Sequence, residues 1–229
     1  FLTSGSNYYD LYEYLYQACA NLVGTSGITS GDCQQVRNAT DAVEMNLEPT
    51  AGFEPMVSPC PVGEAPSDLF FDNMESSTRW NISNLAGATN LWSFITGYAA
   101  SGITSLYVAD IATISDSVAY MNTNVTLAAN AYLHFRHAFG FETGNYDGGV
   151  LEYSTNSGST WIDAGPLWAA GKNYGGIISS SFGNPLGGRS AFVNDSHGYV
   201  SSKYNLSSLS AQNIRFRFRE ANDSSTVGP

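Results

Sequence analysis

The sequence predicts a mainly β fold, an antiparallel jelly-roll-like β-sandwich preceded by a short antiparallel helical hairpin. Residues 67–229 carry many short runs rich in aromatic and β-branched residues, separated by Gly, Asn and Ser. Residues 1–48 carry two apolar stripes with the three- and four-residue spacing of a helix face. Residues 49–66 contain five of the eight prolines and show neither period, which indicates a linker between the two parts.

The first helix is expected over residues 8–23, where Tyr8, Leu11 and Leu15 begin the apolar face. The second stripe starts at Cys33, after a Thr-Ser-Gly-Asp sequence typical of a capped helix start, and it ends before Pro49. Two helices of this length are marginal when isolated. They therefore need a cross-link or a packing partner.

The cysteines supply a candidate cross-link. Cys19 and Cys33 flank a Gly-Thr-Ser-Gly turn and lie on the two apolar stripes, so an antiparallel hairpin brings them within reach of each other. In an oxidising compartment such a bridge stabilises by roughly 3 kcal/mol, whereas in cytosol the same residues would be buried thiols. We favour the disulfide and a secreted, extracellular location. Cys60 is left without a partner.

The sandwich strands are expected where the aromatic and β-branched runs occur. The strongest alternates Ile214, Phe216 and Phe218 with three arginines, so that one face is apolar and the other cationic, and it should be half buried. The expected strands are Leu69–Met74, Leu91–Ile95, Ser105–Ala109, Ser117–Met121, Ala131–Phe139, Gly149–Thr155, Ser190–Val193, Gly198–Tyr204 and Asn213–Arg219.

Charge and hydropathy exclude two classes of partner. Twenty acidic residues against nine basic ones give a net charge of -11, which would repel a nucleic-acid backbone. No run of about 18 apolar residues occurs, so no membrane span is expected. The chain opens at Phe1 on helix-forming sequence without a basic and apolar leader, and we expect it to begin within a longer protein.

No catalytic residue is expected in this chain. The sequence contains neither HExxH nor GxSxG, the motifs of zinc peptidases and of serine hydrolases. His134 and His137 share one expected strand but face opposite sides of it, with His137 inward in a structural role. Asp195-Ser196-His197 is interpreted as a turn, because neighbours in sequence rarely face each other as a triad requires.

Acidic residues leave two further kinds of site possible, a pair of glycosidase carboxylates and a calcium site. A glycosidase needs two carboxylates about 5 to 10 Å apart, and an acidic domain offers such pairs without catalysing anything; the candidates are Glu142, Asp147, Glu152 and Asp163. Asp72, Asn73 and Glu75 cluster at the first expected strand, and Asp147 lies in a Gly-flanked turn. Hard oxygen ligands of this kind hold Ca²⁺, so we predict a structural calcium site at Asp72, Glu75 and Asp147; the alternative is a solvated strand end.

The hairpin resembles a known family. Tyr9-Asp10-Leu11 through Ala18-Cys19, then Ile28 to Cys33 and Val36 to Met45, are similar to the last two helices of thermolysin-like zinc metallopeptidases over about fifty residues. The resemblance implies an upstream peptidase domain as a partner, with zinc only in that missing catalytic domain. None of the family's catalytic residues falls in this chain.

A second resemblance rests on Tyr132–His137, Tyr146–Thr155, Gly183–Arg189, His197–Tyr199 and Ile214–Arg219. These segments are similar to the jelly-roll accessory domains of the MAM and immune inhibitor A type, found on secreted bacterial proteases. The resemblance implies a non-catalytic domain for substrate docking, anchoring or stability on a protein or glycan surface, with a final strand beyond residue 229.

Two rival functions remain open from the residues. The first is a free-standing lectin-like carbohydrate-binding module, in which exposed tryptophans among Trp80, Trp92, Trp161 and Trp168 would stack on sugars; core packing is the alternative role for all four. The second is a hydrolase that uses the sandwich carboxylates.

Overall fold

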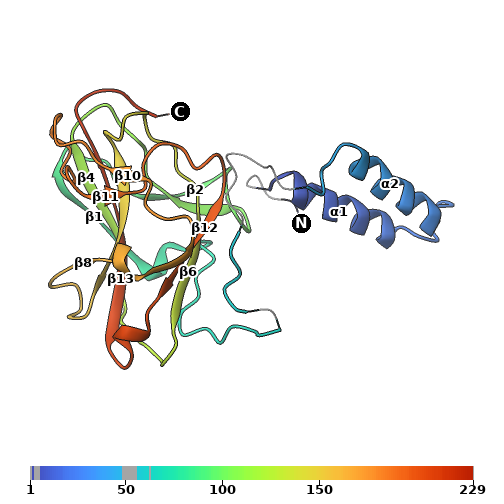
Figure 1. The fold of residues 1–229 in the computed structure, drawn as a ribbon, viewed down its shortest axis with the longest axis horizontal. Helices are drawn as coiled ribbons and strands as arrows, with labels where there is room; N and C mark the ends of the chain where they lie inside the picture. Colours follow the sequence, from blue (N-terminus) through green and yellow to red (C-terminus); the bar gives the residue numbers. More distant parts are fainter. Residues whose placement is uncertain (1, 3–5, 48–55, 62, 229) are drawn as a thin grey trace.

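The computed structural model describes residues 2, 6–47, 56–61 and 63–228. The chain is mainly β, with antiparallel sheets and two helices that pack against each other, so the predicted fold class is confirmed. Figure 1 shows the helical hairpin to one side of the sandwich. The predicted linker 49–66 lies partly outside the described residues.

Both helices begin at a capping box. α1 spans Tyr8–Asn21, and the side chains of Asn7 and Asp10 accept each other's backbone N–H groups. α2 spans Ser30–Ala42 and is capped in the same way by Thr29 and Asp32. These reciprocal bonds satisfy donors that a helix start leaves free. Neither helix is long and apolar enough to cross a membrane.

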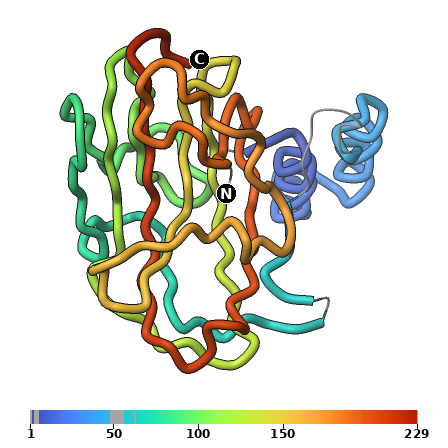
Figure 2. The backbone as a smooth tube through the Cα atoms, turned by 60° about the vertical axis from the view of Figure 1, so that its left-hand side comes forward, coloured from blue at the N-terminus to red at the C-terminus, as the bar shows by residue number. Residues whose placement is uncertain are grey.

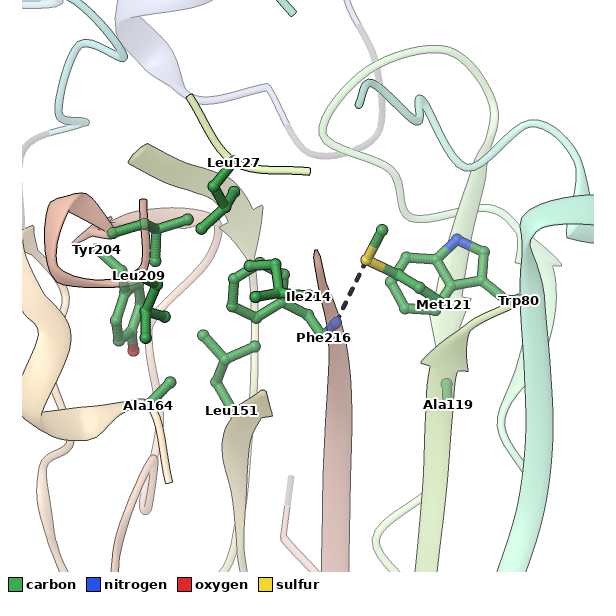
Figure 3. Packing of buried hydrophobic residues seen from close by; sticks show 11 residues of the cluster. Trp80, Ala119, Met121, Leu127, Leu151, Ala164, Tyr204, Leu209, Ile214 and Phe216 are labelled. Atoms are coloured by element: carbon green, nitrogen blue, oxygen red, sulfur yellow. Dashed lines mark hydrogen bonds between the residues drawn. The ribbon is translucent and has the colours of Figure 1, made fainter. Parts of the chain in front are cut away.

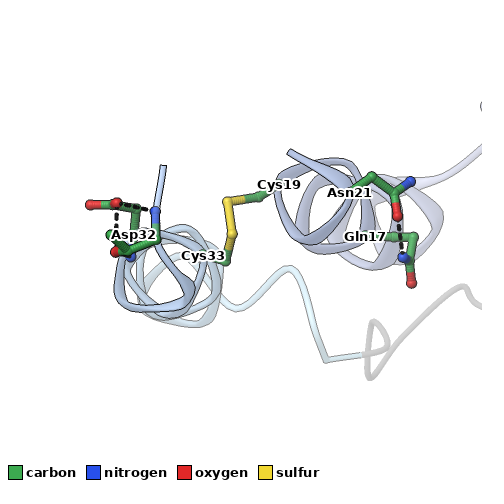
Figure 4. Close-up of a disulfide and its surroundings, with 6 residues drawn as sticks. Gln17, Cys19, Asn21, Asp32 and Cys33 are labelled. Atoms are coloured by element: carbon green, nitrogen blue, oxygen red, sulfur yellow. Dashed lines mark hydrogen bonds between the residues drawn. A yellow bond between two sulfur atoms is a disulfide. The ribbon is translucent and has the colours of Figure 1, made fainter. Parts of the chain in front are cut away.

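A disulfide joins the two helices. Cys19 and Cys33 are bonded, with their Cα atoms 5.4 Å apart, across the turn that separates α1 from α2 (Figure 4). Arg37 adds an ion pair to Glu13 across the hairpin at 3.1 Å. Cys60 is a free thiol.

The hairpin leaves apolar side chains in solvent. No residue of α1 is buried, and Tyr14 and Leu15 are 41% and 39% exposed. Beyond α2, Val43 is 68% exposed. A pair of helices that buries so little apolar surface is typical of an element that packs against something else.

The larger sheet has six antiparallel strands in the order β1-β4-β13-β7-β8, with β5 paired to one end of β13. Their bounds are β1 Trp80–Gly87, β4 Ser115–Met121, β5 Val125–Thr126, β7 Gly148–Ser154, β8 Ile162–Asp163 and β13 Asn213–Asn222. In Figure 2 the red C-terminal strand β13 runs through the middle of this sheet.

The facing layer is built from two smaller sheets. One has the order β6-β12-β9 and the other is the hairpin β2-β3. Their bounds are β2 Ser93–Thr96, β3 Thr104–Tyr107, β6 Tyr132–His137, β9 Trp168–Gly171 and β12 Val200–Asn205. A further pair is β10 Gly176–Ile177 with β11 Ser190–Ala191, and short 3-10 helices span Ser77–Arg79, Gly165–Leu167 and Ser207–Leu209.

The core lies between these layers. Leu151 of β7 and Ile214 of β13 are fully buried against Tyr204 of β12, and Figure 3 shows them in one apolar cluster. Alternation along β13 places Ile214 and Phe216 in this core, as the sequence pattern predicts. The N–H of Phe216 points at the Met121 sulfur at 3.4 Å.

The arginine face of β13 is covered as well. Arg219 makes a two-pronged contact with buried Asp116 at 2.8 and 2.7 Å. Arg217 pairs with buried Glu152, and its guanidinium lies 4.5 Å from the ring centre of Trp161. Arg217 and Arg219 are therefore held in ion pairs that leave little of either side chain exposed to solvent.

One expected strand is wrong. Residues 69–74 form no strand, and the first strand is β1, which the sequence pattern did not predict. Asp72 Oδ1 accepts the N–H of Met74 at 2.8 Å, and Asn73 Oδ1 accepts that of Glu75 at 3.3 Å. Such side-chain turns compete with strand pairing, and Met74 has the positive φ of 61° that follows from one.

Candidate metal centre

Three carboxylates meet at one end of the sandwich. Oxygen atoms of Glu142, Asp147 and Asp223 all lie within 4.8 Å of one another. Asp147 directly precedes β7 and Asp223 directly follows β13, while Glu142 lies in the connection between β6 and β7. Because β7 and β13 are antiparallel neighbours whose last pair is Gly148 with Ala221, the residues just beyond that pair are brought together.

Asp147 and Asp223 are removed from water. Their residues are 0% and 1% exposed. One oxygen of each is engaged: Asp147 Oδ1 accepts the backbone N–H of Asp223, and Asp223 Oδ1 accepts that of Ser225 at 2.7 Å. The second oxygen of each, Oδ2, is buried without a hydrogen-bond partner among the described residues, and so is Oε1 of Glu142. Orphaned buried oxygens are rare in native proteins and call for a proton donor or a cation.

Asp110, which follows β3, borders the cluster. Its Oδ2 accepts the N–H of Gly228 at 2.6 Å, and its Oδ1 is a further buried oxygen without a partner. The carboxyl groups of Asp110 and Asp147 lie within hydrogen-bonding reach of each other. A direct bond between them requires that one carries a proton, whereas a cation between them removes that need.

The electrostatics of the cluster are unfavourable to bare carboxylates. Burial raises the pKa of Asp147 to about 7, and the charges of Asp110 and Asp223 raise it as well, while the N–H of Asp223 acts in the opposite direction. Burial, with the charge of Asp223, also raises the pKa of Glu142. None of the ion pairs formed within the described ranges involves the cluster residues. The negative charge of the cluster is therefore not balanced by an ion pair with any of the described side chains.

Glu220 adds a further buried acid. It is 2% exposed, its Oε1 accepts the side-chain N–H of Asn222, and its Oε2 has no partner. Burial, followed by the charges of Asp110 and Asp147, raises its pKa to about 9. At neutral pH Glu220 is therefore protonated and neutral.

Asn184 holds the cluster in place. Its side-chain nitrogen donates to the backbone oxygens of Tyr146 and Ala221, both at 2.8 Å, and contacts Asp147 Oδ1 at 3.3 Å. Its own Oδ1 accepts the N–H of Leu186 at 2.8 Å. One buried amide thus fixes the start of β7, next to Asp147, and the end of β13, next to Asp223.

An all-oxygen set of this kind suits a hard cation. Ca²⁺ takes six to eight oxygens at about 2.3 to 2.6 Å from carboxylates, backbone carbonyls and water, whereas Zn²⁺ prefers nitrogen and sulfur ligands. The residues present therefore fit calcium. Glu142, Asp147 and Asp223 are the side chains that would hold it.

The structure separates the residues that the sequence grouped. Asp147 lies in the cluster, but Asp72 and Glu75 are not members of it. Asp72 Oδ2 accepts the indole N–H of Trp80 at 3.1 Å, and Glu75 Oε1 accepts the N–H groups of Ile103 and Thr104 at 2.9 and 3.0 Å. Their side chains therefore organise the loop before β1 and the turn between β2 and β3.

Asp110 and Asp223 were missed, and Glu142 was considered only for glycosidase chemistry. A usable signal was present, since Asp110 and Asp223 each follow a strand closely. The signal is weak, because acidic residues at strand ends are common and the sequence does not say which ends meet.

The remaining candidates have structural partners. Glu152 and Asp163 both pair with Arg189, at 2.7 and 2.8 Å. His137 packs among aromatic rings with Nε2 2.8 Å from Ser202 Oγ, and burial lowers its pKa to about 3. His134 Nε2 lies 2.9 Å from the backbone oxygen of Val57.

Comparison with family models, with curated proteins and with solved structures gives no match. The function is therefore argued from the site and the fold.

Proposed function

We propose that the protein is a non-catalytic, calcium-stabilised β-sandwich module that accompanies a secreted zinc peptidase. The observation that carries the calcium part is the set of buried carboxylate oxygens of Asp147, Asp223 and Glu142 that find no hydrogen-bond partner in the part of the chain that the structure describes. Burying several acids together costs free energy unless a cation or protons neutralise them. A calcium ion would convert that cost into stability of the folded state.

Secretion and the peptidase partner rest on the hairpin. The Cys19–Cys33 disulfide is of the kind that persists in oxidising compartments. The exposed apolar side chains of α1, such as Tyr14 and Leu15, favour a further domain that covers them. The resemblance of the hairpin to the last helices of thermolysin-like peptidases indicates that this domain is a zinc peptidase. The sandwich would then serve in substrate docking, anchoring or stability.

Calcium binding is tested with matched pairs of variants. Terbium luminescence sensitised by the aromatic residues, with calcium as competitor, measures the affinity of the full chain. Asp223→Asn and Glu142→Gln should weaken binding by at least about tenfold, because each removes a charged ligand. Asp72→Asn and Glu75→Gln are the matched controls and should leave the affinity unchanged. The reverse pattern would favour the ligand set at Asp72, Glu75 and Asp147, and the absence of binding in the parent chain would contradict a calcium site.

The proposed association with a peptidase is tested in two ways, by the gene sequence upstream of this chain and by the activity of the purified chain. We expect an HExxH motif upstream of residue 1, and a glycosidase domain there would contradict the proposal. The purified chain alone should not hydrolyse casein. Hydrolysis that a chelator abolishes and zinc restores, with host proteases excluded, would show a catalytic centre in the chain itself.

One observation favours the lectin-like alternative. Trp168 is 36% exposed and lines a shallow pocket of about 290 Å³ with Asn205, Ser207 and Ser208, an apolar platform beside amide and hydroxyl groups. Trp80, in contrast, is buried in the core. Glycan-array binding that Trp168→Ala abolishes and Trp161→Phe preserves would support this function, and an array without any bound glycan would remove it.

A further inference from the structure

The outer face of the sheet β6-β12-β9 carries polar side chains that the core does not use. Along β12, Tyr204 points into the core, so alternation places Ser201 and Lys203 on the opposite face. In the register of the sheet, Lys203 lies opposite His134 of β6. Ser201, Lys203 and His134 therefore meet on one outward surface, which we call the outer patch.

Part of the proline-rich segment covers the outer patch. The backbone N–H of Val57 donates to Ser201 Oγ at 2.7 Å, and the Val57 oxygen accepts from His134 Nε2 at 2.9 Å. The next backbone oxygen, that of Ser58, lies 3.4 Å from Lys203 Nζ. Ser201 is only 1% exposed although it lies on an outer face. All three polar contacts are made to the backbone of segment 57–58, so they do not depend on which side chains that segment carries.

Gly171 of β9 makes room for the Val57 side chain. A Cβ at Gly171 would lie 3.0 Å from Val57 Cγ2, and nearer still to the backbone oxygen of Ser201. Gly171 also has a φ of 77°, a conformation that glycine adopts without strain. The outer patch thus offers one hydrogen-bond acceptor, two donors and an apolar contact to two consecutive residues of a polypeptide.

We infer that the outer patch is a binding site for polypeptide backbone, and that segment 57–58 fills it in cis. The chain between the helical hairpin and β1 is then anchored to the sandwich at Val57. An occupant in cis is present at a roughly millimolar effective concentration, so weak contacts suffice to keep the site filled. The inference goes beyond the proposed function, since it depends neither on calcium nor on a peptidase domain.

Solvent exchange of the Val57 amide, measured by NMR on the full chain labelled with 15N-valine, tests the anchor. His134→Leu removes the donor to the Val57 oxygen but leaves Ser201 in place, and it should raise the exchange rate roughly fivefold to tenfold. His134→Gln, which keeps a side-chain N–H, should recover part of the protection. Ser210→Ala changes an exposed serine outside the patch and is the matched control. An unchanged rate in His134→Leu would overturn the site.

Cys60 provides an independent measurement. It is the free thiol of a chain whose other two cysteines are bonded to each other, so it takes a single nitroxide label. Electron paramagnetic resonance should show a restricted label in the parent chain and a faster one in Ser201→Ala, equally in calcium and in EGTA. A label that moves as fast in the folded parent chain as in urea would contradict anchoring, whereas a failed calcium site would leave this result unchanged.

Binding in trans tests the site itself. Val57→Pro removes the N–H that Ser201 accepts and should empty the outer patch. A synthetic peptide of residues 56–61, with Cys60→Ala, should then shift the backbone NMR signals of Ser201 and Lys203 at millimolar concentration. The parent chain, whose site is filled, should require several times more peptide. The absence of shifts in Val57→Pro up to about 10 mM peptide would show that the patch binds no polypeptide in trans, and it would overturn the inference.

Discussion

Asp147 Oδ1 accepts the backbone N–H of Asp223, a residue 76 positions later in the chain. This bond spans the ends of two antiparallel strands, β7 and β13, and it leaves the second oxygen of each carboxylate buried and unpaired. The two acids are therefore held together by the backbone in spite of their mutual repulsion. The response of the protein to calcium and to pH should depend on this arrangement and on the other buried charges.

Calcium should stabilise the chain more at pH 8 than at pH 5. Binding requires ionised carboxylates, and the raised pKa of Asp147, about 7, means that protons compete with calcium below that value. The measurement is the melting temperature in calcium minus that in EGTA at each pH. Taking this difference cancels the contribution of His137, whose lowered pKa makes stability fall as pH drops below about 6.5. A larger shift at pH 5 would contradict the cluster as the site.

Glu220→Gln should stabilise the calcium-free chain, and the gain should grow with pH. An acid with a raised folded pKa takes up a proton on folding, so stability falls as pH rises from its unfolded value, about 4.3, to its folded value, here about 9. The substitution removes this loss, by at most about 1.4 kcal/mol per pH unit, and the new amide keeps an oxygen for Asn222. Urea unfolding in EGTA at pH 5, 7 and 9 measures the difference. A gain that is constant with pH would exclude proton uptake at Glu220.

Arg219→Ala should destabilise the sandwich by about 3 to 5 kcal/mol, because it leaves Asp116 buried without its cation. Arg215→Ala is the control on the same strand face and should cost less, since the Arg215 side chain donates to the exposed side-chain oxygen of Asn124 and forms no ion pair within the described ranges. The double variant Arg219→Ala with Asp116→Asn should recover part of the loss. If urea unfolding gave equal losses of stability for the two arginine variants, the buried Arg219–Asp116 ion pair would not be the cause of the loss.

Cys19→Ser should loosen the hairpin and leave the sandwich folded. The bridge closes a sequence separation of 14, for which the loss is about 3 kcal/mol, and helices of this length are marginal alone. Circular dichroism should show reduced helix signal, while the tryptophan emission of the sandwich keeps its melting temperature. Cys60→Ser, which removes the free thiol, is the control. Simultaneous loss of both signals in Cys19→Ser would mean that hairpin and sandwich fold as one unit.

The sequence by itself determined the elements with strong local signals. The helices follow from apolar stripes with capping residues such as Thr29 and Asp32, and the Cys19–Cys33 bridge follows from a turn of fixed length between them. The core role of β13 follows from strict alternation around Phe216. At Asp72 the sequence predicts a strand, but the structure has a loop. The Asp72 side chain bonds to the backbone N–H of Met74, and this turn overrides residues that otherwise favour a strand.

Only the tertiary structure decided the carboxylate cluster. Its members range from Glu142 to Asp223, and each alone is an ordinary acid outside the strands. Their meeting depends on strand order and register, since the pairing of Gly148 with Ala221 is what sets Asp147 beside Asp223. Burial by the surrounding loops then turns three common acids into a site, because repulsion and lost hydration become strong only where water is excluded.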